Sequence, residues 1–170
     1  MVELMRKLLI TPLLLLALAG FTLSLLAHTL SFFNVDVQSE YPYMWLLHIG
    51  IFLVFIPAIM FLKKRQQSDI LARIPPAFRV LAIALFIYAF FNFFFTIFVL
   101  KQGGCNPVSE NGTYYLKNKG HIVREISENE YEKQRAYDVR LFSGHWMVFY
   151  LFGAGMLYTA LKEGEKSFSL

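Results

Sequence analysis

Three histidines stand near the ends of long apolar stretches, where an ionisable side chain is unusual. They are His28, His48 and His145. Polar groups inside a membrane cost free energy unless they are satisfied, so residues of this kind are rare and often functional. Imidazole nitrogens bind zinc, copper or haem iron, and three imidazoles with a water form a catalytic zinc site. The three histidines are therefore candidate metal ligands, with zinc or haem as the candidate cofactor.

Two further side chains are candidates to complete this site. At a rise of about 1.5 Å per residue, the three histidines fall within one or two turns of the same ends of their stretches, and Asn92 falls about one turn deeper. Asp138 precedes His145 by two helical turns on nearly the same face, so it can orient the imidazole ring. We expect all five side chains, His28, His48, Asn92, Asp138 and His145, to line one ligand-binding cavity.

Spacing alone does not establish a metal site, because the histidines come from different stretches and no H-x-x-x-H or E-x-x-H motif is present. Two other interpretations stay open. The histidines can make hydrogen bonds between helices or lie at the level of lipid headgroups. They can also line a cavity that binds a ligand or handles protons.

Long apolar stretches must position these residues. Four of them contain no Asp, Glu, Lys or Arg apart from Arg79 at the start of the third. A helix needs roughly 20 apolar residues to cross a bilayer, and the hydrophobic fraction of 56% exceeds the roughly 45–50% of soluble domains. We predict an all-α integral membrane protein, a four-transmembrane-helix bundle in a single domain of residues 1–170. The predicted transmembrane helices are residues 8–30, 43–62, 79–100 and 141–161.

Basic residues gather on one side of these helices, and positive charge in short loops marks the cytoplasmic side. They are Arg6, Lys7, Lys63, Lys64, Arg65, Arg73, Arg79, Lys162 and Lys166. On the other side, the 31–42 connection has no Lys or Arg, and residues 101–140 carry seven basic against six acidic residues. We predict a multi-pass protein of the cell (cytoplasmic or inner) membrane, with both termini in the cytoplasm and 101–140 as a folded outer loop.

This outer loop has a local pattern of its own. Two β-prone segments flank a turn-like sequence, which predicts a β-hairpin over residues 113–126. Ser127 and Glu130 have the spacing of a capping box, so a helix is expected from about Glu128. Residues 103–107, around the single cysteine, are expected to form a turn.

The loop composition favours recognition over catalysis, because its charges balance and tyrosine is favoured at interfaces. The tyrosines expected to be exposed are Tyr114, Tyr115, Tyr131 and Tyr137. The leading hypothesis is a non-enzymatic binder: a subunit or accessory of a membrane complex, or a receptor-like or immunity-type protein. Its expected partners are the lipid bilayer and a membrane or extracytoplasmic protein, not nucleic acid. The alternative is a metal- or haem-dependent membrane redox protein or hydrolase that uses the histidines.

Overall fold

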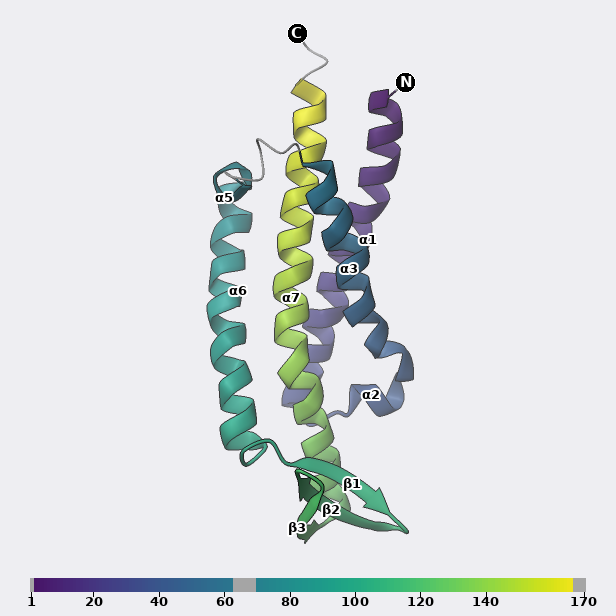
Figure 1. Ribbon diagram of the computed structural model, residues 1–170, viewed down its shortest axis with the longest axis vertical. Helices are drawn as coiled ribbons and strands as arrows, with labels where there is room; N and C mark the ends of the chain where they lie inside the picture. Colours follow the sequence, from purple (N-terminus) through teal and green to yellow (C-terminus); the bar gives the residue numbers. More distant parts are fainter. Residues whose placement is uncertain (1, 63–69, 167–170) are drawn as a thin grey trace. The chain divides into compact units, whose positions relative to one another are not determined.

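The computed structural model describes residues 2–62 and 70–166, which are mostly helical and include one small sheet (Figure 1). The helical elements are α1 (Val2–Phe32), α2 (Val37–Glu40), η1 (Pro42–Trp45), α3 (Leu46–Phe61), α5 (Ile70–Arg73), α6 (Pro76–Phe95), η2 (Thr96–Leu100) and α7 (Glu128–Lys166). The strands are β1 (Asn106–Glu110), β2 (Thr113–Asn118) and β3 (His121–Ile126). Residues 63–65, which entered the charge argument above, lie outside the described residues.

Among residues 2–62 and 70–166, three helical segments are long and apolar enough to cross a membrane: Lys7–Phe32, Pro42–Phe61 and Pro76–Leu100. Only 22%, 17% and 17% of their most apolar windows are buried within the protein. Apolar side chains that are left exposed in such numbers require a nonaqueous environment, because a soluble domain exposes only limited apolar patches. The chain is therefore a membrane-embedded helical protein.

The fourth predicted span, residues 141–161, is helical throughout and lies inside α7. It is not among the three strongly apolar segments. Most of its side chains are instead buried, and several positions are small or polar, including Ser143, Gly153 and Thr159. Small residues let neighbouring helices approach closely, and they also lower the mean hydropathy. A fourth membrane crossing therefore stays a prediction.

The chain divides into two compact units. Unit one consists of the described residues of Met1–Ser24, Leu46–Phe86 and Trp146–Leu170. Unit two consists of Leu25–Trp45 and Ile87–His145. Each unit is described by itself below, and the single-domain expectation stays a prediction.

The core of unit one is organised around Tyr150 of α7. Its buried hydroxyl donates a hydrogen bond to the Leu47 carbonyl oxygen of α3 at 2.8 Å. A Cβ at Gly20 of α1 would lie 2.4 Å from the Tyr150 ring, and a Cβ at Gly50 of α3 would lie 2.1 Å from the hydroxyl oxygen. Because these two glycines have no side chain, the Tyr150 side chain has room to pack between α1 and α3.

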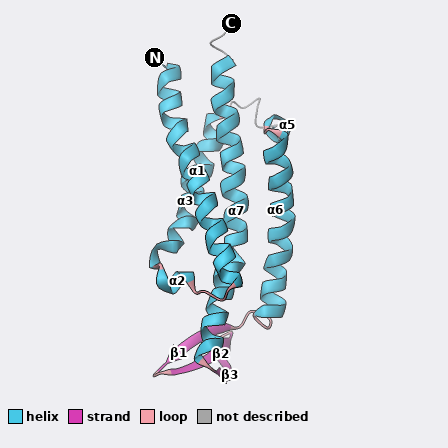
Figure 2. Cartoon of the chain, turned by 180° about the vertical axis from the view of Figure 1, so that it is seen from behind, coloured by secondary structure: helices cyan, strands magenta, loops and turns pink. Residues whose placement is uncertain are grey.

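The sheet of unit two is antiparallel, in the order β1-β2-β3, and it lies by the first turns of α7 (Figure 2). β2 and β3 form the hairpin expected over residues 113–126. β1 was not expected, because Pro107 and the preceding glycines suggested a turn through residue 107. The strand begins at Asn106 instead, and Pro107 is tolerated because β1 is an edge strand.

A small apolar core joins this sheet to α7. Cys105, Leu116 and Ile126 are buried together, and Tyr114 and Tyr131 pack against them. α7 then begins at Glu128, where the sequence predicts a helix. The Glu130 amide donates to Ser127 Oγ at 3.2 Å, which satisfies one of the free amides of the first turn.

Candidate functional site

His28 of α1 is buried in unit two, and both of its ring nitrogens have partners. Nδ1 lies 2.7 Å from Ser143 Oγ, and Nε2 lies 2.5 Å from the Tyr88 hydroxyl. A neutral imidazole has one donor and one acceptor nitrogen, so two hydroxyls satisfy it completely. In this arrangement His28 links α1 to α6 and α7, and neither nitrogen is left for a ligand.

Asn92 is buried nearby in the same unit, and its partner is a residue that the sequence analysis counted only as a loop charge. Asn92 Nδ2 donates to the Arg140 carbonyl oxygen and Oδ1 accepts from Arg140 Nε, both at 3.0 Å. The Arg140 guanidinium carbon also lies 4.0 Å from the centroid of the Phe32 ring. Arg140 thereby joins α6, α7 and the end of α1, and a cation–π contact holds its guanidinium against Phe32.

Asp138 and His145 do not pair with each other in the hydrogen bonds of the described residues, because each has a different partner. Asp138 Oδ1 accepts a hydrogen bond from Lys101 Nζ at 2.5 Å, and Lys101 is only 3% exposed. His145 Nδ1 lies 3.3 Å from the Leu141 carbonyl oxygen, one turn back on α7, and its ring edge packs on Phe93 at 5.1 Å. The prediction that Asp138 orients the His145 ring thus has no support from the hydrogen bonds of these residues.

His48 belongs to unit one, where its ring packs edge-on against Trp146 at 4.9 Å between centroids. His28 and His145 belong to unit two. Within residues 2–62 and 70–166, no group of three or more His, Cys, Asp or Glu side chains is arranged to hold a metal ion. Ligation of zinc or haem by these histidines stays a prediction without support from the described residues.

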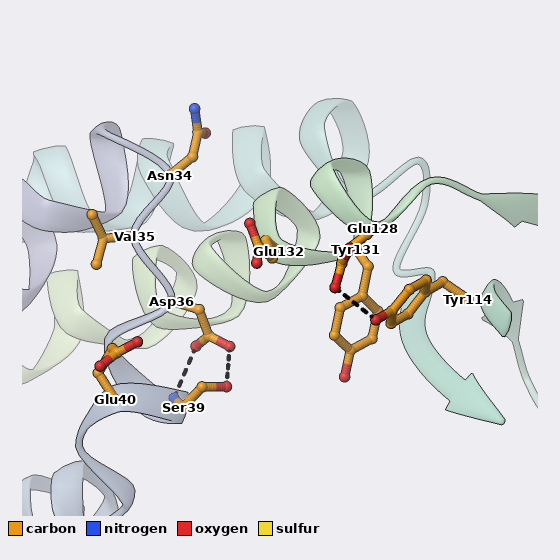
Figure 3. A pocket seen from close by; sticks show the side chains of 9 residues that line it. All are labelled: Asn34, Val35, Asp36, Ser39, Glu40, Tyr114, Glu128, Tyr131 and Glu132. Carbon is orange, nitrogen blue, oxygen red and sulfur yellow. Dashed lines mark hydrogen bonds between the residues drawn. The ribbon is translucent and has the colours of Figure 1, made fainter. Parts of the chain in front are cut away.

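A different feature of unit two, which we call the acidic groove, has the form of a binding site. It is a cavity of about 310 Å³. Its lining residues are Asn34, Val35, Asp36, Ser39, Glu40, Tyr114, Glu128, Tyr131 and Glu132 (Figure 3). One wall is the chain from the end of α1 through α2, and the other is the start of α7 with β2. Four carboxylates and two phenol rings line it, without any Lys or Arg.

An ion pair fixes the two walls of the acidic groove. Arg135 Nε donates to Asp36 Oδ2 at 3.0 Å, and Arg135 also contacts Ser39 Oγ at 3.3 Å. Asp36 accepts from the Ser39 and Gln38 amides as well, which caps α2. Burial alone would raise the pKa of Asp36, but hydrogen bonds from Ser39 and Arg135 outweigh it and lower that pKa. Asp36 is therefore an ionised structural residue of the groove.

The opposite wall is arranged by tyrosines. The Tyr114 hydroxyl donates to Glu128 at 3.0 Å, which raises the pKa of Tyr114, and its ring lies 4.8 Å from that of Tyr131 (Figure 3). Glu40 and Glu132 are exposed, and neither has an ion-pair partner among the residues that the structure describes. The groove thus presents two uncompensated carboxylates beside two aromatic rings.

Sequence reasoning identified part of this groove. Tyr114 and Tyr131, which were expected to be exposed, lie on one wall of the groove. Both side chains are half-buried. The expectation that Tyr137 is exposed is wrong, because that ring is 8% exposed. Asp36 was missed, since its partner Arg135 lies 99 residues away. The one signal in the sequence was that the 31–42 connection contains Asp36 and Glu40 but no Lys or Arg.

No family model matches the chain, and neither a curated protein nor a solved structure shows significant similarity to it.

Proposed function

We propose that the chain is a multi-pass protein of the cell (cytoplasmic or inner) membrane that acts by binding. Its outer loop, residues 101–140, recognises a cationic segment of a membrane or extracytoplasmic protein. In this proposal the chain crosses the membrane four times and has both termini in the cytoplasm. It serves as a subunit, an accessory or a receptor-like component rather than as an enzyme. The acidic groove is the observation that carries the proposal.

The charges of the groove favour a cationic partner. Arg135 offsets the charge of Asp36, and Glu128 is held by the Tyr114 hydroxyl. Glu40 and Glu132 remain as carboxylates that a Lys or Arg side chain of another molecule would complement. The neighbouring phenol rings add to this attraction, because a cation is stabilised over the face of an aromatic ring.

The size of the groove and the arrangement of its carboxylates favour a Lys or Arg side chain over a metal ion. Its volume of about 310 Å³ is at the lower end of the roughly 300–1,000 Å³ typical of ligand pockets, so it suits one or two side chains. Within the described part of the chain, its carboxylates do not form a group that would hold a metal ion. An extended basic segment that places one side chain in the groove fits both observations.

Exchange of the two uncompensated carboxylates tests the proposal. Binding of a fluorescent oligolysine peptide to the purified full chain in nanodiscs is measured by fluorescence anisotropy. We expect Glu40→Gln with Glu132→Gln to weaken binding roughly three- to tenfold, because exposed ion pairs contribute about 0.2–1 kcal/mol each. Both side chains are exposed, so the double variant should fold normally.

The matched control is Glu125→Gln, which removes one exposed carboxylate of β3 outside the groove lining. It should leave the affinity unchanged. An oligoglutamate peptide should not bind. Equal affinity of the parent protein and the double variant for oligolysine, or an equal loss in the Glu125 variant, would show that the groove does not select the cation.

A further inference from the structure

A second cavity of unit two lies where a membrane-spanning segment ends. It has a volume of about 410 Å³, and we call it the membrane-end cavity. Val99 and Leu100, the last residues of the Pro76–Leu100 segment, form part of its lining. The first turns of α7 supply most of the rest, including Asn129, Lys133 and Gln134. Its position and its mixed lining distinguish it from the acidic groove.

The α6 side of this cavity continues into exposed apolar surface. Val99 is 58% exposed and Phe95 is 48% exposed, and Phe91 lies one turn further back at 67%. Phe91 and Phe95 are four residues apart and share one face of α6, and Val99 of η2, which lines the cavity, extends this apolar strip. An acyl chain can lie along this strip while its headgroup occupies the cavity.

The α7 side presents one cationic side chain, that of Lys133. Lys133 has no ion pair among the described residues, whereas the nearby carboxylate of Glu130 is paired with Arg124 through two hydrogen bonds. This pairing lowers the pKa of Glu130 and offsets its charge. The N-terminus of α7, capped by Ser127, adds the positive end of a long helix dipole. A phosphate group is the complementary ligand for this wall.

Gln134 adds an independent observation on the inner wall. The residue is only 4% exposed, and its amide nitrogen donates to the Leu100 carbonyl oxygen at 3.2 Å. Its amide oxygen is buried and accepts no hydrogen bond from the described residues. A buried acceptor without a donor is costly. A ligand that donates hydrogen bonds would remove this cost.

We propose that the membrane-end cavity binds the headgroup of an ethanolamine phospholipid from the surrounding bilayer. The phosphate lies by Lys133 and the start of α7, the primary ammonium donates toward Gln134, and one acyl chain follows the strip from Phe91 to Val99. A choline headgroup has no N–H donor and cannot satisfy Gln134. The proposal is independent of the acidic groove, because the two cavities share no lining residue.

Retention of lipid by the purified full chain tests this proposal. The protein is reconstituted in nanodiscs of equal phosphatidylethanolamine and phosphatidylcholine, extracted in mild detergent, and analysed by native mass spectrometry. We expect phosphatidylethanolamine to be retained roughly three- to tenfold over phosphatidylcholine, the effect of one hydrogen bond that only the primary ammonium can donate. Gln134→Leu should reduce this preference toward equality, whereas Lys133→Gln should lower the retention of both lipids, because both carry the phosphate.

Lys119→Gln is the matched control, since it removes one exposed lysine of the same loop outside the cavity. It should retain lipid as the parent does. Lys133 is exposed, so its variant gives an answer even if the Gln134 variant unfolds. Equal retention of the two lipids by the parent, or parent-like retention by Lys133→Gln, overturns the proposal. Displacement of the lipid by soluble glycerophosphoethanolamine at a similar concentration also overturns it, because the acyl chain would then contribute nothing.

Discussion

Asp36 links the shape of the acidic groove to pH. Its pKa is lowered on folding, because hydrogen bonds from Ser39 and Arg135 outweigh the effect of burial. A carboxylate of this kind adds stability above its unfolded pKa of about 3.9, and the stability is lost as pH falls through the lower folded value. We predict that Asp36→Asn lowers the free energy of unfolding by about 1–2 kcal/mol at neutral pH, through its lost charged hydrogen bonds.

Thermal unfolding of the detergent-solubilised protein across a pH series checks this prediction. The difference in Tm between the parent and the Asp36 variant should be full at neutral pH and should shrink in strong acid. Glu125→Gln, which alters an exposed carboxylate outside the groove lining, should follow the parent at every pH. A gap in Tm that stays constant from neutral to strongly acidic pH would contradict the role of the Asp36 charge.

His28 shows how far single residues could be predicted. The small and polar stripe of residues 17, 20, 24 and 28 predicts that His28 faces protein, and the side chain is 4% exposed. Its partners Ser143 and Tyr88 lie 115 and 60 residues away, and no local spacing predicts such pairs. The same limit applies to Arg140, which reads as the last charge of a loop and lies instead against Asn92 and Phe32.

Elements were easier to predict than contacts, because their signals are local. Apolar runs located the helices, and the Ser127–Glu130 spacing located the start of α7. β1 was missed because Pro and Gly indicate turns unless the strand is known to lie at an edge, and edge position depends on the finished sheet. The burial of the 141–161 stretch likewise depends on which helices pack around it.

Packing between the helices of unit one yields a sharp prediction at Gly50. A Cβ there would lie 2.1 Å from the Tyr150 hydroxyl oxygen but 3.3 Å from the ring carbon that carries it. Gly50→Ala should therefore lower the Tm by several degrees, on the scale of about 1–3 kcal/mol for overpacking. Tyr150→Phe should restore most of this loss in the double variant, after allowance for the Leu47 hydrogen bond that it removes.

Two other glycines serve as controls for this experiment. Gly20→Ala places its Cβ 2.4 Å from the Tyr150 ring itself, so Tyr150→Phe should not rescue it. Gly144→Ala meets no atom closer than 3.5 Å and should be tolerated or slightly stabilising. Equal rescue of the Gly20 and Gly50 variants by Tyr150→Phe would rule out the steric explanation.

For the whole molecule, the charge distribution predicts which side of the membrane each loop occupies. In a Cys105→Ala background, a cysteine introduced at Asn118, the last residue of β2, should react with an impermeant maleimide added outside intact cells. A cysteine introduced at Lys162, near the end of α7, should react only after the membrane is permeabilised. Labelling of the second site but not the first in intact cells would invert the proposed topology.

The place of Tyr150 in the chain sets an order of events during biosynthesis. The ring that fills the space left by Gly20 and Gly50 belongs to a helix translated after both α1 and α3, and its hydroxyl binds a carbonyl 103 residues earlier. While α7 is still being translated, α1 and α3 lack the side chain around which they pack. Until α7 is in place, the surfaces around Gly20 and Gly50 contact the translocon or lipid. Unit one is therefore completed only after α7 has been synthesised, when the Tyr150 ring packs against α1 and α3.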